Sequence, residues 1–153
     1  MKIGVISDTH GFLDSKVLQL FTGVSHILHA GDIGADAIVA ELATIAPVTA
    51  VLGNTDSSPA FRLNEVVALA DRKFLVYHIV EPRALNENLR LQMSRARPDV
   101  VVFGHTHRAF CEIIDGVMFL NPGYAGKPKP GAECSVAILH CGKKEIRHEF
   151  IPL

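Results

Sequence analysis

A seven-residue stretch, VVFGHTH at positions 101–107, constrains this chain more than any other part of its sequence. Its apolar half is typical of a buried strand, and Gly104 predicts a tight turn where that strand ends. His105 and His107 are two positions apart, and in an extended backbone such residues point the same way. Two neutral imidazoles that face one small volume make half of a metal site. The stretch therefore predicts a metal centre at a strand end.

Four earlier apolar segments end in the same manner, each with a side chain that can bind a metal. Open α/β sheets bind their ligands at the carboxyl ends of the strands, so we expect these side chains to meet the two histidines. The candidate ligands are Asp8 and His10 after residues 2–7, Asp32 after residues 26–30, Asn54 after residues 48–52 and His78 after residues 74–77.

The first half of the chain alternates strands with helices. A helix capped by Asp14 is predicted, with its apolar face at positions 17, 18, 21 and 24. A second helix, capped by Asp36, has apolar positions 38, 42 and 45 and ends at Pro47. A third is predicted to start at Pro82 and to stop before Pro98. The β-α-β-α-β order of the first part implies parallel strands with right-handed connections.

Hairpins dominate the rest. Residues 65–69 and 73–77 predict a hairpin about Asp71-Arg72, and residues 99–103 predict a buried strand. Residues 111–114 and 117–120 flank Asp115-Gly116, a strong two-residue turn signal. Residues 134–140 and 145–151 flank Gly142-Lys143, and the segment 121–131 is too rich in Gly and Pro for regular structure. A core of two sheets with helices outside is the expected packing.

Length, charge and cysteine content exclude several classes of protein. A chain of 153 residues is expected to form a single domain over 1–153. Fifteen basic and sixteen acidic residues leave a net charge of −1, so duplex nucleic acid and anionic membranes are not expected partners. No apolar run approaches the ~20 residues of a membrane span. Three cysteines without a CxxC pair, and a start without the apolar region of a signal peptide, predict a cytoplasmic location. A mean hydropathy of +0.25 suggests that a second copy covers some apolar surface, as in a homo-oligomer.

These residues, in their order along the chain, resemble the calcineurin-like metallophosphoesterases, and especially their small single-domain bacterial and archaeal phosphodiesterases. The resemblance covers essentially the whole chain, including an Asn-Pro-Gly at positions 121–123. It implies an α/β (α+β) fold, a four-layer αββα sandwich of two mixed β-sheets with a two-metal centre at the C-terminal strand edge. The ligands that it implies are Asp8, His10 and His107 for one metal, Asn54, His78 and His105 for the other, and Asp32 as the bridge.

The chemistry explains these residue types. A phosphodiester is anionic and repels hydroxide, whereas two cations about 3.5–4 Å apart lower the pKa of a bound water to about 7 and hold the attacking and leaving oxygens. The seven ligands are therefore also the predicted catalytic residues of a phosphodiesterase, in which a metal-bridging hydroxide attacks a small phosphodiester. Asp32 is expected to bridge with both carboxylate oxygens free. Mixed imidazole and oxygen ligands favour Mn, Fe, Zn, Co or Ni over Ca, and the resemblance makes Mn²⁺ the preferred metal.

Three positions depart from the pattern of the relatives. Thr55 stands where many larger relatives have a histidine after Gly-Asn, which predicts a poor phosphomonoesterase. Ile79 and Val80 follow His78, where relatives commonly have glycine, and their branched side chains are expected to crowd the second metal.

Several nearby residues have two interpretations each. Asp56 either orients a ligand or caps its loop, and His29 either supports the site or simply packs in its strand. Tyr124 either stacks on a base or leaving group of the substrate or packs within its loop. The cationic side chains nearest in sequence to the predicted metal centre are Arg108, Lys127 and Lys129. Each either pairs with a phosphate oxygen of the substrate or is solvated.

Two other functions stay open. One is a phosphomonoesterase (a nucleotidase) or a nuclease acting on short nucleic acid. The other is a non-catalytic protein-interaction module, because a retromer subunit has this fold and binds a partner through an apolar face.

Overall fold

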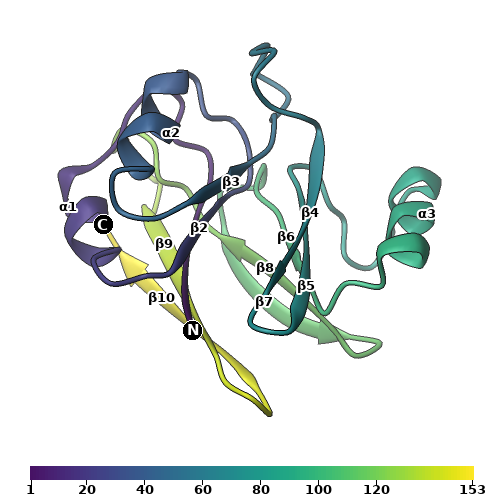
Figure 1. Cartoon of the computed structure of the whole chain (residues 1–153). Coiled ribbons are helices and arrows are strands. Elements are labelled where there is room, and N and C mark those ends of the chain that lie inside the picture. The colour runs from purple at the N-terminus through teal and green to yellow at the C-terminus, as the bar shows by residue number, and fades with distance from the viewer.

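Two five-stranded β-sheets pack face to face at the centre of the molecule (Figure 1). The computed structural model describes residues 1–153. The first sheet has the strand order β10 (Ile146–Pro152), β9 (Ser135–Cys141), β1 (Lys2–Ile6), β2 (His26–His29) and β3 (Val48–Ala50). The second sheet has the order β4 (Asn64–Leu69), β5 (Arg72–Tyr77), β6 (Val100–Val102), β8 (Val117–Pro122) and β7 (Ala109–Ile114).

Helices cover the outer face of each sheet. In Figure 1, α1 (Ser15–Leu20) and α2 (Asp36–Leu42) lie beside the first sheet, and α3 (Glu87–Ala96) lies beside the second. Both sheets mix parallel with antiparallel pairs: β1 is parallel to β2 and antiparallel to β9, while β5 is parallel to β6 and antiparallel to β4. The predicted αββα sandwich of two mixed sheets is confirmed.

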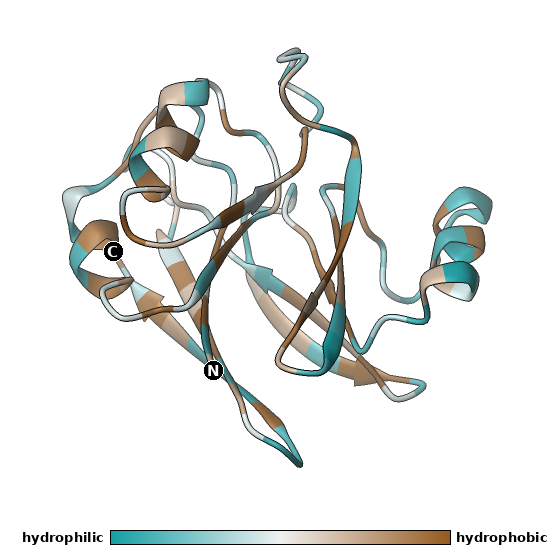
Figure 2. Cartoon of the chain, in the orientation of Figure 1, coloured by the Kyte–Doolittle hydropathy of each residue, from teal (hydrophilic) through white to brown (hydrophobic).

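Side-chain alternation along the strands builds three apolar layers. In β6, Val100 and Val102 face the core between the two sheets, whereas Val101 faces α3. In β1, Val5 faces the other sheet and Ile6 faces α1 and α2. Successive side chains of a strand point to opposite faces, so strands covered on both sides are apolar throughout, and Figure 2 shows them largely brown.

Parallel pairing brings the ends of several strands to one edge. Ile6 of β1 pairs with His29 of β2, which in turn pairs with Ala50 of β3. In the second sheet, Val76 of β5 pairs with Val102 of β6. The segments that follow these five strands therefore leave the sandwich at the same end, as the sequence predicts.

The helix starts are partly as predicted. Asp14 caps α1, because its carboxylate accepts a hydrogen bond from the N–H of Lys16 at 2.9 Å. Asp36 does not cap α2: Ala35 is the N-cap, and the Asp36 carboxylate accepts a hydrogen bond from Ser58 Oγ instead. This helix also ends at Leu42, well before Pro47.

The third helix starts later than predicted. It begins at Glu87 rather than at Pro82, because the side chain of Asn86 caps it by accepting the N–H of Leu89 at 2.9 Å. The residues just before it form a turn closed by the Ala84 N–H and the Glu81 carbonyl. The helix ends at Ala96, ahead of Pro98 as predicted.

The hairpin predictions need small corrections. The Asp115-Gly116 turn is confirmed, with φ of 50° and 80°. The turn between β4 and β5 consists of Ala70 and Asp71, because the register begins at Leu69 opposite Arg72. Residues 142–145 join β9 to β10, a longer connection than a two-residue turn at Gly142-Lys143.

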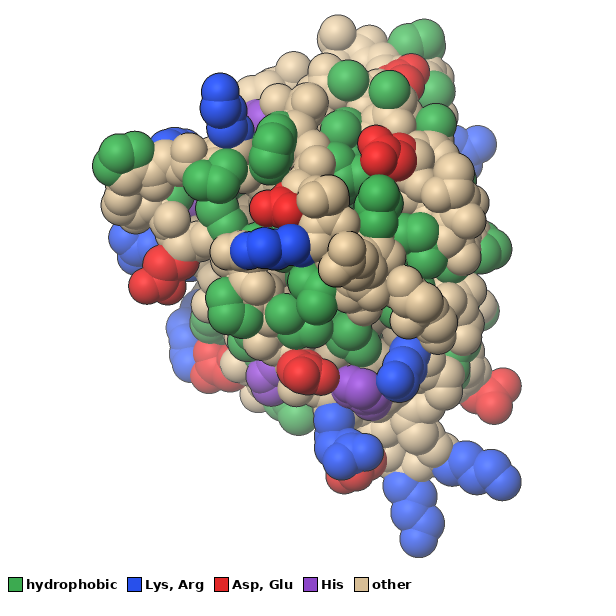
Figure 3. Space-filling view, turned by 90° about the vertical axis from the view of Figure 1, so that its left-hand side faces the viewer, with side chains coloured by type: hydrophobic (Ala, Val, Ile, Leu, Met, Phe, Trp, Pro, Cys, Tyr) green, Lys and Arg blue, Asp and Glu red, His purple; other side chains and the backbone are tan.

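The outer face over α1 and α2 is neither uniformly charged nor uniformly hydrophobic. Basic and acidic side chains are scattered there among hydrophobic ones (Figure 3). None of the three helices is long and apolar enough to cross a membrane.

Candidate metal centre

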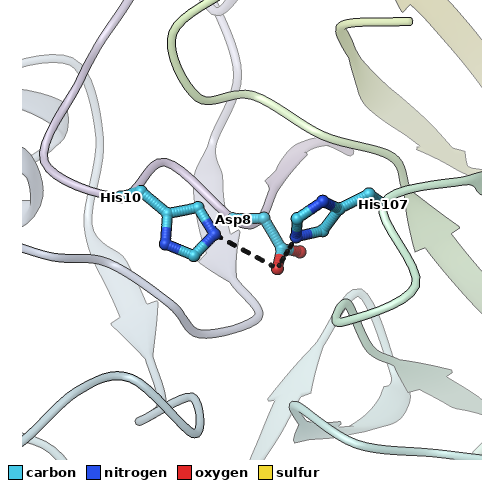
Figure 4. A group of neighbouring side chains, drawn as sticks. All are labelled: Asp8, His10 and His107. Atoms are coloured by element: carbon cyan, nitrogen blue, oxygen red, sulfur yellow. Dashed lines mark ion pairs between the residues drawn. The ribbon is translucent and has the colours of Figure 1, made fainter. Parts of the chain in front are cut away.

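The seven predicted ligands come together where the five strands end. Two groups of three side chains have their ligand atoms within 4.8 Å of one another, one of Asp8, His10 and His107, the other of Asp8, Asp32 and His78. Figure 4 shows the first group, with the rings of His10 and His107 on either side of the Asp8 carboxylate. The structure thus contains two candidate metal clusters that share Asp8.

The carboxylate of Asp8 has one satisfied and one unsatisfied oxygen. Oδ2 accepts hydrogen bonds from Ser7 Oγ at 2.7 Å and from the N–H of His105 at 3.1 Å. Oδ1 accepts none, although the residue is fully buried. It faces the Nε2 atoms of three histidines, at 3.2 Å from His107, 3.9 Å from His78 and 4.0 Å from His10. An unpaired buried carboxylate oxygen is costly, and a cation among these nitrogens would compensate it.

Asp32 lies between His78 and His10. Its Oδ2 is 3.4 Å from Nε2 of His78 and 3.7 Å from Nε2 of His10. Its Oδ1 accepts the N–H of Thr55 at 2.9 Å and so is not free. The position suits a bridge, but the expected reason was wrong, because Oδ2 is the one oxygen that faces both histidines.

The remaining ligand atoms meet at Asn54. Its Oδ1 is 3.1 Å from Nε2 of His78 and 3.0 Å from Nδ1 of His105. The Nδ1 of His78 lies 2.7 Å from the carbonyl oxygen of Ala30, so this nitrogen carries the proton and donates it. In the neutral tautomer with the proton on Nδ1, the Nε2 lone pair faces an amide oxygen that is also an acceptor. Two acceptors facing each other fit a site built for a cation.

The separations between these atoms fit metal coordination. Two ligands bound about 2.1 Å from one metal lie about 3.0 Å apart at a right angle and about 4.2 Å apart on opposite sides. The measured separations around Asp8, Asp32 and Asn54 run from 3.0 to 4.0 Å. Together with the unsatisfied Asp8 oxygen, they show that the residues present suit a pair of divalent cations.

Left-handed backbone, rather than extended backbone, aims most of these side chains. His105 and His107 have φ of 69° and 59°, and Asp8, His10 and Asp32 also have positive φ. The two histidines do converge, but not because an extended strand points them the same way. The chain turns at each of them. Such conformations are uncommon for residues other than glycine and cluster at functional sites.

Three glycines let the ligand loops approach one another. A Cβ on Gly104 would overlap Ser7 Oγ and Asp8 Oδ2, and one on Gly53 would overlap the Asp32 carboxylate. A Cβ on Gly31 would come within 2.7 Å of His78 Nδ1. The predicted tight turn is present, because the Gly104 carbonyl accepts the N–H of Thr106 at 2.8 Å. Gly104 has no positive φ, so close approach is what requires glycine there.

Asp56 caps and joins two of these loops. Its carboxylate accepts the N–H groups of Ile33 at 3.0 Å, Gly34 at 2.9 Å and Gly53 at 2.8 Å. Burial alone would raise the pKa of Asp56, but these hydrogen bonds outweigh it and hold the pKa below its usual value. Of its two interpretations, the structure shows the loop cap.

His29 supports the first ligand loop from beneath. It is fully buried, and the N–H of Gly31 approaches its Nδ1 at 3.3 Å. The proton of the neutral ring therefore lies on Nε2, which donates to Thr9 Oγ1 at 2.9 Å, and Thr9 in turn donates to the carbonyl of Ile33. Burial lowers the pKa of His29 to about 3, so the ring stays neutral.

Tyr124 packs against two histidines of the site. Its ring centre lies 4.8 Å from that of His107 and 6.1 Å from that of His10. Its hydroxyl donates to the carbonyl of Lys127 at 3.1 Å, and the side chain is 5% exposed. The ring therefore braces the histidines and is too covered to stack on a substrate base.

Burial is the main cause that lowers the pKa of His107, and the charges of His10 and Lys129 add to it.

The two branched residues that follow His78 have different surroundings. Val80 packs with Leu89 in the layer under α3, and Ile79 is 43% exposed. The expected crowding of the second metal position by these two side chains stays a prediction.

Two supporting residues were missed by the sequence reasoning. Ser7 donates to Asp8 Oδ2, and buried Asn121 donates to the carbonyl of Gly104 at 2.8 Å and to Thr106 Oγ1 at 3.0 Å. The Oδ1 of Asn121 accepts the N–H of Gly123 at 2.9 Å. An asparagine before Pro-Gly at a strand end was the available signal, because such residues commonly bond to the backbone two positions on.

Known proteins are similar to this chain in sequence and in fold. A model of the calcineurin-like phosphoesterase superfamily domain matches residues 1–144. A probable metallophosphoesterase of Methanothermobacter thermautotrophicus is 35% identical over 161 residues, covering 99% of this chain and 92% of the relative. The phosphodiesterase YfcE of Escherichia coli is 32% identical over 170 residues, covering 91% of this chain and 87% of the relative. The crystal structure of Vps29 with Zn²⁺ from Entamoeba histolytica matches with a TM-score of 0.78 at 23% identity, over 99% of each chain.

Proposed function

The chain belongs to the calcineurin-like phosphoesterase superfamily, and on this premise we propose that it is a metal-dependent phosphodiesterase. Its substrate is a small phosphodiester, and its preferred metal is Mn²⁺. Relatives named as phosphodiesterases support the diester reading, among them that of Methanocaldococcus jannaschii, 29% identical over 96% of this chain.

The observation that carries the proposal is the unsatisfied Oδ1 of Asp8 among three imidazole nitrogens. A purely structural cluster would pair this buried oxygen with a hydrogen-bond donor. Asp8, His10 and His107 would hold one cation, and Asn54, His78 and His105 the other. Oδ2 of Asp32 would serve both.

The residues of the chain prepare the site for hydrolysis. Two divalent cations, when bound, lower the pKa of a coordinated water and offset the negative charge of the phosphate. The Ala30 carbonyl places the proton of the neutral His78 tautomer on Nδ1, and Ser7 with the His105 N–H leaves only Oδ1 of Asp8 for the cation. The ring of Tyr124 packs against those of His10 and His107.

Thr55 favours diesters over monoesters. Its N–H donates to Asp32 Oδ1, and in the sequence it follows Gly-Asn, where many larger relatives have a histidine. Without that imidazole, the chain has one fewer cationic or proton-donating group for the doubly charged monoester. The diester carries a single negative charge and is the better match.

The direct test is hydrolysis of bis-p-nitrophenyl phosphate. We expect turnover with added Mn²⁺, none after EDTA treatment, and a loss of at least about 100-fold in kcat for Asp32→Ala. Glu87→Ala, which removes an exposed carboxylate from α3, is the matched control and is expected to stay within about twofold of the original protein.

The outcomes separate the alternatives. Turnover that persists in EDTA would refute a metal mechanism. A higher kcat/KM for p-nitrophenyl phosphate would show a monoesterase instead. Purified protein that binds no metal and hydrolyses neither ester would point to an interaction module.

A further inference from the structure

A large pocket opens directly beside the candidate metal centre. It has a volume of about 1130 Å³ and begins at Thr106 and His107. Its walls come from Arg108, from the segment 129–135 and from the end of β10, including Phe150. Because His107 belongs both to this pocket and to the first metal cluster, the pocket is continuous with the site where a phosphodiester would bind.

We infer that this pocket binds one ester substituent of the substrate and that this substituent carries a second phosphate group. The inference rests on the proposed phosphodiesterase function and adds a substrate class to it.

The charges on the wall favour an anionic group. Arg108 and Lys129 line the pocket, are exposed, and take part in none of the ion pairs of the structure. Glu133 is the single acidic residue on the wall, so the two cations outnumber it. An arginine presents a planar pair of donors that matches two phosphate oxygens, and a lysine adds a mobile point charge.

Lys129 lies close to the metal cluster. Its Nζ is 4.7 Å from the ring centre of Tyr124, and that ring is 4.8 Å from the imidazole of His107. One aromatic ring therefore separates this cation from a candidate ligand. A second phosphate on the same substrate molecule can reach Lys129 while the scissile phosphate lies at the metal centre.

The rest of the wall suits the body of such a substituent. Phe150 and Pro152 of β10 and Pro130 of the neighbouring segment contribute apolar surface to the wall. The volume is larger than an alkyl or phenyl group needs and slightly exceeds the usual range of small-ligand sites, about 300–1,000 Å³. A phosphorylated nucleoside or sugar combines a ring for this surface with an anion for the cations.

Two substrates that differ only in one phosphate test the inference. Thymidine 5′-(p-nitrophenyl phosphate) and its 3′-phosphorylated form both release p-nitrophenol. We expect kcat/KM to be about tenfold higher for the 3′-phosphorylated form, mainly through a lower KM. The form without the 3′-phosphate lacks one charged hydrogen bond to the pocket, which accounts for a difference of this size. The preference is expected to fall as NaCl is raised from 50 to 500 mM, because both cations are exposed.

Single variants locate the second phosphate. Arg108→Ala and Lys129→Ala are each expected to lower the preference about threefold or more, whereas Glu133→Gln is expected to raise it, a gain that misfolding cannot produce. Lys127→Ala is the matched control, because Lys127 is an exposed cation of the same loop that does not line the pocket. Binding of thymidine 3′,5′-bisphosphate to protein kept in EDTA gives a readout without turnover, and Arg108→Ala should weaken it.

The inference and the proposed function fail in different ways. Protein that hydrolyses neither bis-p-nitrophenyl phosphate nor the thymidine esters contradicts the proposed function. Protein that hydrolyses bis-p-nitrophenyl phosphate but shows no preference for the 3′-phosphorylated ester contradicts the inference alone. A preference that survives both Arg108→Ala and Lys129→Ala would also overturn it.

Discussion

Oδ1 of Asp8 lies 3.2 Å from Nε2 of His107 and accepts no hydrogen bond, although Asp8 is fully buried. The carboxylate is therefore a cost to the folded protein when no cation is bound. A metal that binds the folded state and not the unfolded state removes this cost and raises the free energy of unfolding.

The first prediction concerns this metal-linked stability. With Mn²⁺ at a hundredfold excess over its Kd, about 2.7 kcal/mol of stabilisation is expected, which raises Tm by roughly 5–10 °C in a chain of this size. Asp8→Asn should abolish the increase and, in EDTA, should be at least as stable as the original protein. Asp71→Asn, in an exposed left-handed turn that asparagine tolerates, serves as the control. Calorimetry with and without metal makes the comparison, and an equal Tm increase in Asp8→Asn would contradict it.

The second prediction concerns Gly104. In Gly104→Ala the new methyl group would overlap Ser7 Oγ and the Asp8 carboxylate, so the ligand loop must shift. A displacement of about 1 Å at a reacting centre costs about 100-fold in rate, and we expect at least that loss in kcat, with weaker metal binding. Gly142→Ala, where a Cβ meets nothing closer than 3.4 Å, should retain activity. Steady-state kinetics and a metal titration measure both effects, and an active Gly104→Ala would disprove the role assigned to close approach.

The third prediction concerns acid stability and His29. Its folded-state pKa of about 3 is below the unfolded value of about 6.5, so the unfolded chain binds one more proton between these values. The free energy of unfolding should therefore fall by up to about 1.4 kcal/mol per pH unit as pH drops below 6.5. His29→Gln should remove this contribution to the slope. Urea unfolding in EDTA from pH 4 to 8 tests it, and parallel curves for the two proteins would refute the prediction.

The fourth prediction concerns Asp56. Its folded-state pKa is lower than the unfolded one, so its contribution is present above about pH 4 and is lost as pH falls through the folded value. Asp56→Asn replaces one of the two carboxylate oxygens that accept the three backbone N–H groups by an NH₂ donor, and should cost about 1–3 kcal/mol at pH 7. The difference between the two proteins should narrow as pH falls below about 4. Denaturant unfolding at both pH values provides the measurement, and a difference independent of pH would count against it.

Much of the fold followed from local pattern. Apolar runs predicted the buried strands, Asp14 predicted a helix start, and Asp115-Gly116 predicted a turn, because each signal depends on neighbours only a few residues away. The predicted start of α3 was wrong. Asn86 caps α3 where Pro82 was expected to start it, since a side-chain cap that accepts an N–H outweighs a favourable φ.

The sequence by itself determined which side chains stand at strand ends, and parallel pairing brought Asp8, Asp32, Asn54 and the histidines to one edge. Only the tertiary structure decided how they face one another. The His105 N–H reaches Asp8 Oδ2 across 97 residues of chain, Thr55 occupies one oxygen of Asp32, and Tyr124 braces His107. Strand ends are set by hydrophobic periodicity, which is local. Backbone turns into left-handed conformations and the hydrogen bonds of buried carboxylates depend instead on groups that become neighbours only when the two sheets pack together.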